Sequence, residues 1–377
     1  MKNHWFKKIT HQLHLWLGLI TGSIVFIIAI TGCLYAFKDE IENVTQPYRY
    51  VQIENKEFLP PSRIQKIAEK VLPNIPLHAI EYHEKNESVQ AIFYQEEPKH
   101  YYVVYLNPYN GKVLQTVNME AGFFRWVLNG HFYLWLPKAI GQPLVATITV
   151  LFFFLVISGI ILWWPKNKKV FDKRIWFRWK EGIKWKRKNY DLHSITGFYI
   201  CAFALIFIIT GLVWGFKWFA YSYYTGIGGE KSLIYQEPVS VKSDNFKATN
   251  PEASIDYIWQ QLQKTEPQAK SIEVHIPETD TSSISVNINT DKGTYWKRDF
   301  RYYDQYTLQE LPVNHLYGRF KNADVSDKIM RMNYDIHVGA ILGLPGKIFA
   351  FLISLLIASL PVTGFLIWYG RKFKSKN

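Results

Sequence analysis

Four long apolar stretches, separated by more polar segments, dominate the hydropathy pattern of the chain. They comprise residues 15–37, 140–164, 195–216 and 348–369. A helix needs about 20 predominantly apolar residues to cross the roughly 30 Å of hydrocarbon in a bilayer, and each stretch is long enough. The pattern therefore predicts a mainly α-helical membrane protein with four transmembrane helices in a lipid bilayer.

Basic residues are distributed unevenly among the segments that connect these stretches. The 377-residue chain has 44 Lys and Arg against 31 Asp and Glu, and eleven of the basic residues fall within 166–191. Further basic residues precede the first stretch and follow the last, so the three basic segments share one side of the topology. The positive-inside rule makes that side cytoplasmic. We expect an N-in, C-in, multi-pass protein, and we interpret the charge as a topology signal that implies no nucleic-acid partner.

The predicted organisation alternates helices with exterior segments. We expect the cytoplasmic N-terminus and the first helix in 1–38, and the second helix in 140–165. A basic cytoplasmic loop follows in 166–191 and the third helix in 192–218. The fourth helix and the C-terminus lie in 342–377. The exterior segments, 39–139 and 219–341, each start with a helical pattern and continue with alternating strand patterns. We predict two small α+β exterior domains, which lack disulfides because Cys33 and Cys201 both lie in apolar stretches.

The chain carries an internal duplication. A shift of 179 residues places the first stretch on the third without a gap, and LVISGIILWW (155–164) corresponds to LPVTGFLIWY (360–369). The matched pairs are His14 and His193, Gly18 and Gly197, Gly32 and Gly211, Gly159 and Gly364, and His131 and His337. One unit of helix, exterior domain and helix is thus predicted to occur twice.

A competing interpretation concerns the first stretch alone. A basic start followed by IAITGC (28–33) resembles a signal peptide that ends in a lipid-modified Cys33, and its removal would discard His14. The same pattern recurs as IITG (208–211) in the third stretch, in mid-chain, where no signal peptide lies. We therefore favour a first transmembrane helix.

Histidines stand at the ends of these stretches, where an ionisable side chain is costly and suggests function by default. At about 100° and 1.5 Å per residue, Gly18 shares the helix face of His14, and Gly32 returns to that face about 27 Å deeper. The second and fourth helices run in the opposite direction, so their histidines approach from the exterior, each on a short interfacial helix or turn before a Leu-Pro pair. The predicted pairs are His14 with His193 inside, and His131 with His337 outside.

Two histidines that converge across a helix bundle beside glycines match the needs of haem. Its iron takes two axial imidazoles, and its porphyrin needs apolar walls. We predict two haem b groups, bound without covalent links because the sequence has no C-x-x-C-H motif. Two filled axial positions favour electron transfer over oxygen chemistry. The glycines assigned to these sites are Gly18, Gly32, Gly159, Gly197, Gly211 and Gly364.

Other interpretations of the same residues stay open. A single interfacial histidine is often a headgroup anchor, and glycines at helix contacts are ordinary membrane packing. His11 is a rival to His14, although its counterpart in the repeat is Tyr190. Zinc is less apt, because its structural sites usually have four close ligands.

Several motifs resemble those of PepSY-associated transmembrane proteins, and in particular of their ferric-siderophore reductase members. They are HLWLGLITG (14–22), GHFYLWLP (130–137), HSITGFY (193–199), DIHVGAILGLPGK (335–347) and VTGFLIWYG (362–370). The resemblance covers essentially the whole chain, and the exterior segments are similar to PepSY domains, although Asn107 and Asp304 match the family's turn only loosely.

The resemblance implies an oxidoreductase of the bacterial cytoplasmic membrane with two haems b. It would carry electrons outward and reduce ferric siderophores, Fe(III) to Fe(II), in the periplasm. Its iron ligands carry over onto His14 and His193 on the cytoplasmic side, and onto His131 and His337 on the periplasmic side. The sequence has no dinucleotide-binding pattern, so we expect a separate electron donor, either a cytoplasmic flavoprotein reductase or quinol.

Two further functions compete with this one. In the first, the chain is a non-redox regulatory or assembly protein, whose PepSY modules bind partners while the helices anchor these modules in the membrane. A membrane anchor does not need two histidines on each side. In the second, the chain transports haem or a metal, which calls for polar residues along the bundle centre. The middle of each predicted helix is almost wholly apolar.

Overall fold

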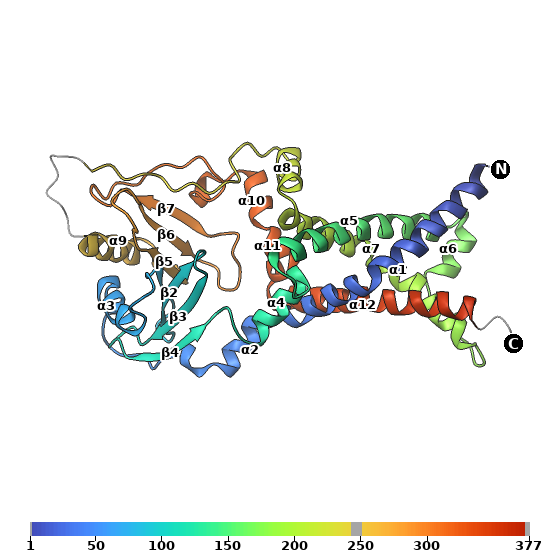
Figure 1. Ribbon diagram of the computed structural model, residues 1–377, viewed down its shortest axis with the longest axis horizontal. Coiled ribbons are helices and arrows are strands. Elements are labelled where there is room, and N and C mark those ends of the chain that lie inside the picture. The colour runs from blue at the N-terminus through green and yellow to red at the C-terminus, as the bar shows by residue number, and fades with distance from the viewer. Residues whose placement is uncertain (1, 243–250, 374–377) are drawn as a thin grey trace. The chain divides into compact units, whose positions relative to one another are not determined.

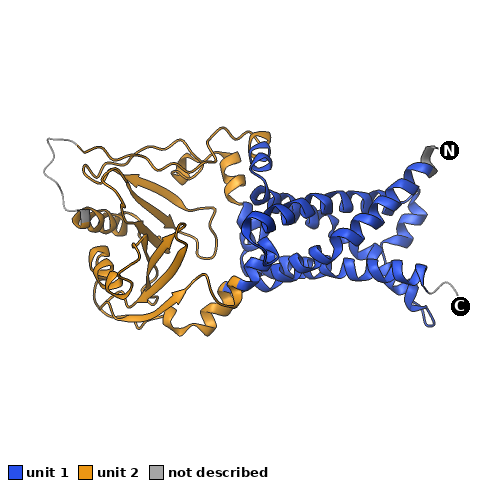
Figure 2. Ribbon diagram, in the orientation of Figure 1, with its two compact units in different colours: residues 1–38, 126–223, 333–377 blue, residues 39–125, 224–332 orange. Residues whose placement is uncertain are grey.

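The computed structural model describes residues 2–242 and 251–373, which form two compact units. The membrane unit comprises residues 1–38, 126–223 and 333–377, and the sheet unit comprises residues 39–125 and 224–332 (Figure 2). Each unit is assembled from segments that are distant in the sequence. The exterior segments of both repeat halves contribute to the sheet unit.

Four long helices form the membrane unit: α1 (Lys2–Ala36), α5 (Lys138–Trp163), α7 (Trp185–Gly215) and α12 (Gly343–Lys372) (Figure 1). All four are long and apolar enough to cross a membrane. Helices α1 and α7 each pack against α5 and α12, so α1 and α7 occupy opposite corners of the bundle. A cluster of buried aliphatic residues lies within it and consists of Val25, Ala29, Ile148, Ile200, Ala204, Ile353, Ile357 and Ala358. The four predicted transmembrane helices are thus confirmed as helices of the required length and composition.

Short helices precede two of the long ones. Helix α4 (Phe123–Tyr133) leads to α5, and α11 (Asn333–His337) leads to α12. The first break contains Leu134 and Trp135, both with positive φ, and Pro137 caps α5. The second break runs through Gly339 and Gly343, which take φ of 80° and 64° because glycine has no Cβ to clash there. The remaining short helices of this unit are α6 (Lys168–Arg174) and η3 (Ala340–Leu342).

The sheet unit contains one seven-stranded antiparallel sheet of order β4-β3-β2-β1-β5-β6-β7. Its strands are β1 (Ala79–Tyr82), β2 (Val89–Gln95), β3 (His100–Leu106), β4 (Val113–Asn118), β5 (Ser271–His275), β6 (Ile284–Asn289) and β7 (Asp299–Tyr303). Helices α3 (Pro61–Val71) and α9 (Pro251–Thr265) pack their apolar residues on the sheet and form its core. The other helices are α2 (Lys38–Thr45), η1 (Pro47–Arg49), α8 (Lys217–Gly226), η2 (Phe320–Asn322) and α10 (Val325–Arg331), of which α8 runs from one unit into the other.

The two exterior segments, predicted as two α+β domains, supply two halves of this one sheet. Each half has one helix that packs on the sheet, α3 in the first half and α9 in the second. These helices coincide with the helical patterns of the sequence that begin at residues 60 and 251. The halves join through β1 and β5, in a register that pairs Ala79 with His275 and Tyr82 with Ile272. Joining them removes two exposed strand edges, which would otherwise be free to pair with other chains.

Candidate functional site

The membrane unit brings four histidines together in two pairs. The ring centroids of His14 on α1 and His193 on α7 lie 6.3 Å apart, with an angle of 77° between the ring planes. Those of His131 on α4 and His337 on α11 lie 6.2 Å apart, with an angle of 74°. The partners are those predicted from the repeat. His11 is exposed, so the ring that faces His193 is that of His14.

The spacing within each pair suits one metal ion between two imidazoles. A nitrogen–metal bond is about 2.0 Å long and each ring centre lies about 1 Å beyond its nitrogen, so ligation from opposite sides separates the centroids by roughly 6 Å. Both pairs have this separation, at 6.3 and 6.2 Å. Because α1 and α7 are opposite corners of the bundle, the space between His14 and His193 lies in the bundle interior.

Hydrogen bonds fix the tautomer of the first pair. His14 Nδ1 lies 3.2 Å from the Leu155 carbonyl oxygen and 3.0 Å from Ser158 Oγ. His193 Nδ1 lies 3.2 Å from the Leu360 carbonyl oxygen and 3.0 Å from Thr363 Oγ1. A carbonyl oxygen only accepts, so we assign the proton to Nδ1 in both rings, which leaves the Nε2 lone pair free to bind a metal.

The second pair has the same arrangement. His131 Nδ1 donates to the Ile28 carbonyl oxygen at 2.9 Å and lies 3.3 Å from Thr31 Oγ1. His337 Nδ1 lies 2.8 Å from Thr210 Oγ1, and that hydroxyl itself donates to a carbonyl of its own helix at 2.7 Å. Thr210 must therefore accept from His337. Such second partners on Nδ1 are typical of metal-ligating histidines, whose orientation they fix.

Each pair supplies only two protein ligands. Within residues 2–242 and 251–373, no group of three or more His, Cys, Asp or Glu side chains has a geometry that would hold a metal ion. A structural zinc site usually has four close ligands, whereas each pair here consists of two histidines. Two opposed imidazoles in an apolar bundle instead fit a metal whose remaining ligands come from a macrocycle, as in haem.

Four glycines lie directly against the histidine rings. A Cβ added at Gly159 or Gly364 would lie 3.1 Å from Cε1 of His14 or His193, respectively. At Gly32 it would lie 3.3 Å from His131, and at Gly211 it would lie 3.5 Å from His337. The sequence pattern predicts that these glycines leave space for a cofactor. In the structure each of them leaves space for a histidine ring, and this histidine lies on another helix of the same repeat half.

The other two predicted glycines have looser surroundings. A Cβ at Gly18 or Gly197 would meet a leucine methyl group, of Leu155 or Leu360, at 3.8 Å. This is an ordinary van der Waals contact. The two positions remain equivalent under the duplication, and both lie one helical turn from the first histidine pair.

Sequence reasoning missed the hydroxyl partners of the histidines. Ser158, Thr363, Thr31 and Thr210 each directly precede the glycine on which a histidine packs. A signal for them exists, because every one of the four spans contains a Ser-Gly or Thr-Gly dipeptide in ISG, VTG or ITG. The dipeptide provides two things to one imidazole: space for its ring and an oxygen for its Nδ1.

Two asparagines were missed as well. The pentapeptides NYDLH (189–193) and NYDIH (333–337) each place an asparagine one turn before a histidine. Asn189 donates to the Thr363 carbonyl oxygen and Asn333 to the Thr210 carbonyl oxygen, both at 3.0 Å. Each amide thus ties its histidine-bearing helix to the residue whose hydroxyl accepts from that histidine. Both side chains are buried, and their Oδ1 atoms have no hydrogen-bond partner among the described residues.

These observations define the class of the protein: a multi-pass membrane protein with a histidine pair at each end of a four-helix bundle and a helix-backed antiparallel sheet. The family model of the PepSY-associated TM region matches residues 11–371, a range that includes all four histidines. The chain belongs to this family. No curated protein matches its sequence.

Proposed function

We propose that each histidine pair binds one haem b, and that the protein transfers electrons across the membrane. The observation that carries this proposal is the opposed pair itself, 6.3 Å apart for His14 and His193 and 6.2 Å for His131 and His337, with Nδ1 held by another helix. Bound haem supplies one-electron redox chemistry. The two histidines of each pair would hold the haem through Nε2, and this would favour electron transfer over oxygen chemistry.

The surrounding residues have defined roles in this proposal. Ser158, Thr363, Thr31 and Thr210 orient the imidazoles, and hydrogen bonding at Nδ1 also increases the basicity of Nε2. The aliphatic interior between the two pairs excludes water. Gly32 lies eighteen residues beyond His14 on α1, so the two sites are separated by about 27 Å along the helix. This separation supports the proposed transfer of electrons from one side of the membrane to the other.

We further propose that the acceptor is a periplasmic ferric siderophore. The family resemblance supports this substrate, and the chemistry is coherent because siderophore oxygens bind Fe(III) far better than Fe(II). One electron therefore loosens the metal without breakdown of the chelator. The donor would be a cytoplasmic flavoprotein reductase or quinol.

The proposed location is the bacterial cytoplasmic membrane, with both termini inside and the sheet unit in the periplasm. The positive-inside rule supports it, since the segment between α5 and α7 carries eleven basic residues. In this topology His14 and His193 form the cytoplasmic pair. His131 and His337 form the periplasmic pair.

Reconstituted liposomes test this function. Purified protein is placed in vesicles that enclose dithionite, a ferric hydroxamate siderophore is added outside, and Fe(II) is detected with ferrozine. We expect Fe(II) with the wild-type protein and only background with the His14→Ala/His193→Ala double variant. The proposal would be contradicted if Fe(II) formed at the same rate with the wild-type protein, with that variant and with empty vesicles. This result would favour a non-redox, membrane-anchored regulatory or assembly protein.

A further inference from the structure

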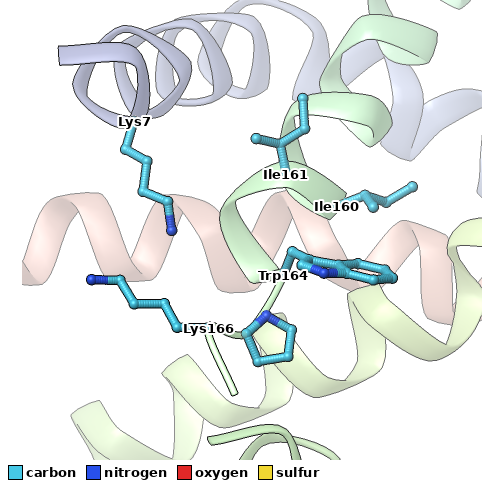
Figure 3. Close-up of a pocket in the computed structure, with 6 residues that line it drawn as sticks. Lys7, Ile160, Ile161, Trp164 and Lys166 are labelled. Atoms are coloured by element: carbon cyan, nitrogen blue, oxygen red, sulfur yellow. The ribbon is translucent and has the colours of Figure 1, made fainter. Parts of the chain in front are cut away.

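A cavity of about 410 Å³ opens beside the end of α5 that lies near His14. Its lining is apolar apart from two lysines, and consists of Lys7 from α1 and of Ile160, Ile161, Trp164, Pro165 and Lys166 from the end of α5 and the segment after it. Figure 3 shows the side chains of Lys7 and Lys166 on one side of the view, and Ile160, Ile161 and Trp164 on the other.

The described part of the chain provides no carboxylate partner for the two lysines. Neither Lys7 nor Lys166 forms an ion pair with a carboxylate among residues 2–242 and 251–373. Two ammonium groups that share one opening repel each other, and an anion between them would replace this repulsion with two attractions. The cavity thus suits a ligand that has an anionic group at one end and an apolar body at the other.

The position of the cavity identifies the ligand. Helix α5 ends at Trp163, so Trp164 and Lys166 lie where the apolar stretch gives way to the basic segment. Tryptophan and lysine at this boundary lie at the level of the lipid headgroups. Basic pockets between transmembrane helices on the cytoplasmic side bind anionic lipid headgroups.

We propose that this cavity binds an anionic phospholipid. The phosphate lies between the ammonium groups of Lys7 and Lys166, and an acyl chain covers Ile160 and Ile161. The site is independent of haem. It has a consequence for the histidine pair, because Ile160 directly follows Gly159, the residue on which His14 packs. A lipid in the cavity therefore stabilises the contact between α1 and α5 that positions His14.

Lipid binding to the delipidated full-length protein tests the proposal. Native mass spectrometry and thermal unfolding are recorded with added phosphatidylglycerol or phosphatidylcholine. We expect selective retention of phosphatidylglycerol and a higher Tm with it. The Lys7→Gln/Lys166→Gln variant should bind phosphatidylglycerol roughly 25-fold more weakly, the product of about fivefold for each lysine.

The matched control is Lys8→Gln/Lys168→Gln, which removes the same charge one and two residues away in the sequence, at positions that do not line the cavity, and should keep the wild-type affinity. Equal phosphatidylglycerol binding by both double variants would overturn the proposal. Displacement of phosphatidylglycerol from the wild-type protein by millimolar inorganic phosphate would also overturn it, in favour of a soluble phosphate ligand. Haem content is measured in parallel, so a failure of the haem proposal is seen separately.

Discussion

Histidines occur close together in both units of the protein, but the two kinds of pair differ. In the sheet unit the ring centroids of His78 and His275 lie only 4.8 Å apart, in direct edge-to-face contact. Both rings also lie near carboxylates: His275 Nε2 is 3.4 Å from Glu273, and His78 Nδ1 is 3.7 Å from Glu278. In the membrane unit the separations are 6.3 and 6.2 Å, and all four rings form hydrogen bonds through Nδ1.

The difference shows what distinguishes the proposed ligand pairs from two rings in direct contact. Rings in contact leave no room for a metal on the line between them, whereas roughly 6 Å accommodates one. A carboxylate partner suits a histidine that titrates, while a carbonyl or hydroxyl on Nδ1 fixes the neutral tautomer with Nε2 available. Proximity of two histidines is therefore a weak signal. Spacing, tautomer and duplication together are a strong one.

The largest expected effect comes from removal of a ligand. His14→Ala and His193→Ala should each abolish the same haem, about half of the total, and leave the spectrum of the other intact. His78→Ala, in the sheet unit, should leave the haem content unchanged and serves as the matched control. Pyridine haemochrome and low-temperature spectra measure this. Loss of a different haem in each of the two membrane variants would contradict the pairing.

Loss of an Nδ1 partner should have a smaller effect. Thr363→Val removes the hydroxyl at 3.0 Å from His193 and leaves only the Leu360 carbonyl oxygen as acceptor. Changes of this kind weaken metal affinity by about 10- to 100-fold. We expect faster haem loss to apomyoglobin from Thr363→Val, with wild-type behaviour restored in Thr363→Ser. Identical loss rates in all three proteins would remove this role from Thr363.

The glycine contacts predict a graded packing effect. A Cβ at Gly159 lies 3.1 Å from His14, and one at Gly18 lies 3.8 Å from Leu155. Gly159→Ala should therefore displace the His14 ring and lower stability by about 1–3 kcal/mol, as overpacking usually does. Gly18→Ala should change stability by less than about 0.5 kcal/mol. Thermal unfolding of the two variants compares them, and equal losses would contradict the contact.

A pH effect is expected in the sheet unit. Burial lowers the pKa of His275 below 6.5 by more than the carboxylate of Glu273 raises it. Below about pH 6.5 the unfolded chain therefore binds more protons than the folded chain does. The free energy of unfolding falls as the pH falls through this range, and His275 contributes at most about 1.4 kcal/mol per pH unit to this change. His275→Gln should flatten the dependence of Tm on pH between 7 and 5, relative to the wild-type protein. An unchanged slope would show that other groups cause it.

Much of the architecture could be predicted because hydropathy and charge act over long segments. The four helices, the pairing of His14 with His193 and of His131 with His337, and α3 and α9 all follow from periodicity or from the repeat. The union of the two exterior halves into one sheet could not be predicted, since the pairing of β1 with β5 joins residues almost 200 positions apart and leaves no local pattern.

The site was predicted less completely. Histidines and glycines are rare enough in apolar stretches to draw attention, while serine and threonine are common there and donate to their own helix. Only the contact with a second helix shows that Ser158 and Thr363 also accept from His14 and His193. The roles of Asn189 and Asn333 likewise depend on which carbonyl oxygen lies opposite them.

The number of haems bound per chain decides between a redox protein and a membrane anchor. The protein is expressed with ample haem, purified in detergent, and examined by oxidised and dithionite-reduced spectra together with a pyridine haemochrome assay per chain. We expect about two low-spin haems b per chain, one for each histidine pair. A protein that is folded and free of haem would contradict it, and the four histidines would then be structural residues of a membrane anchor.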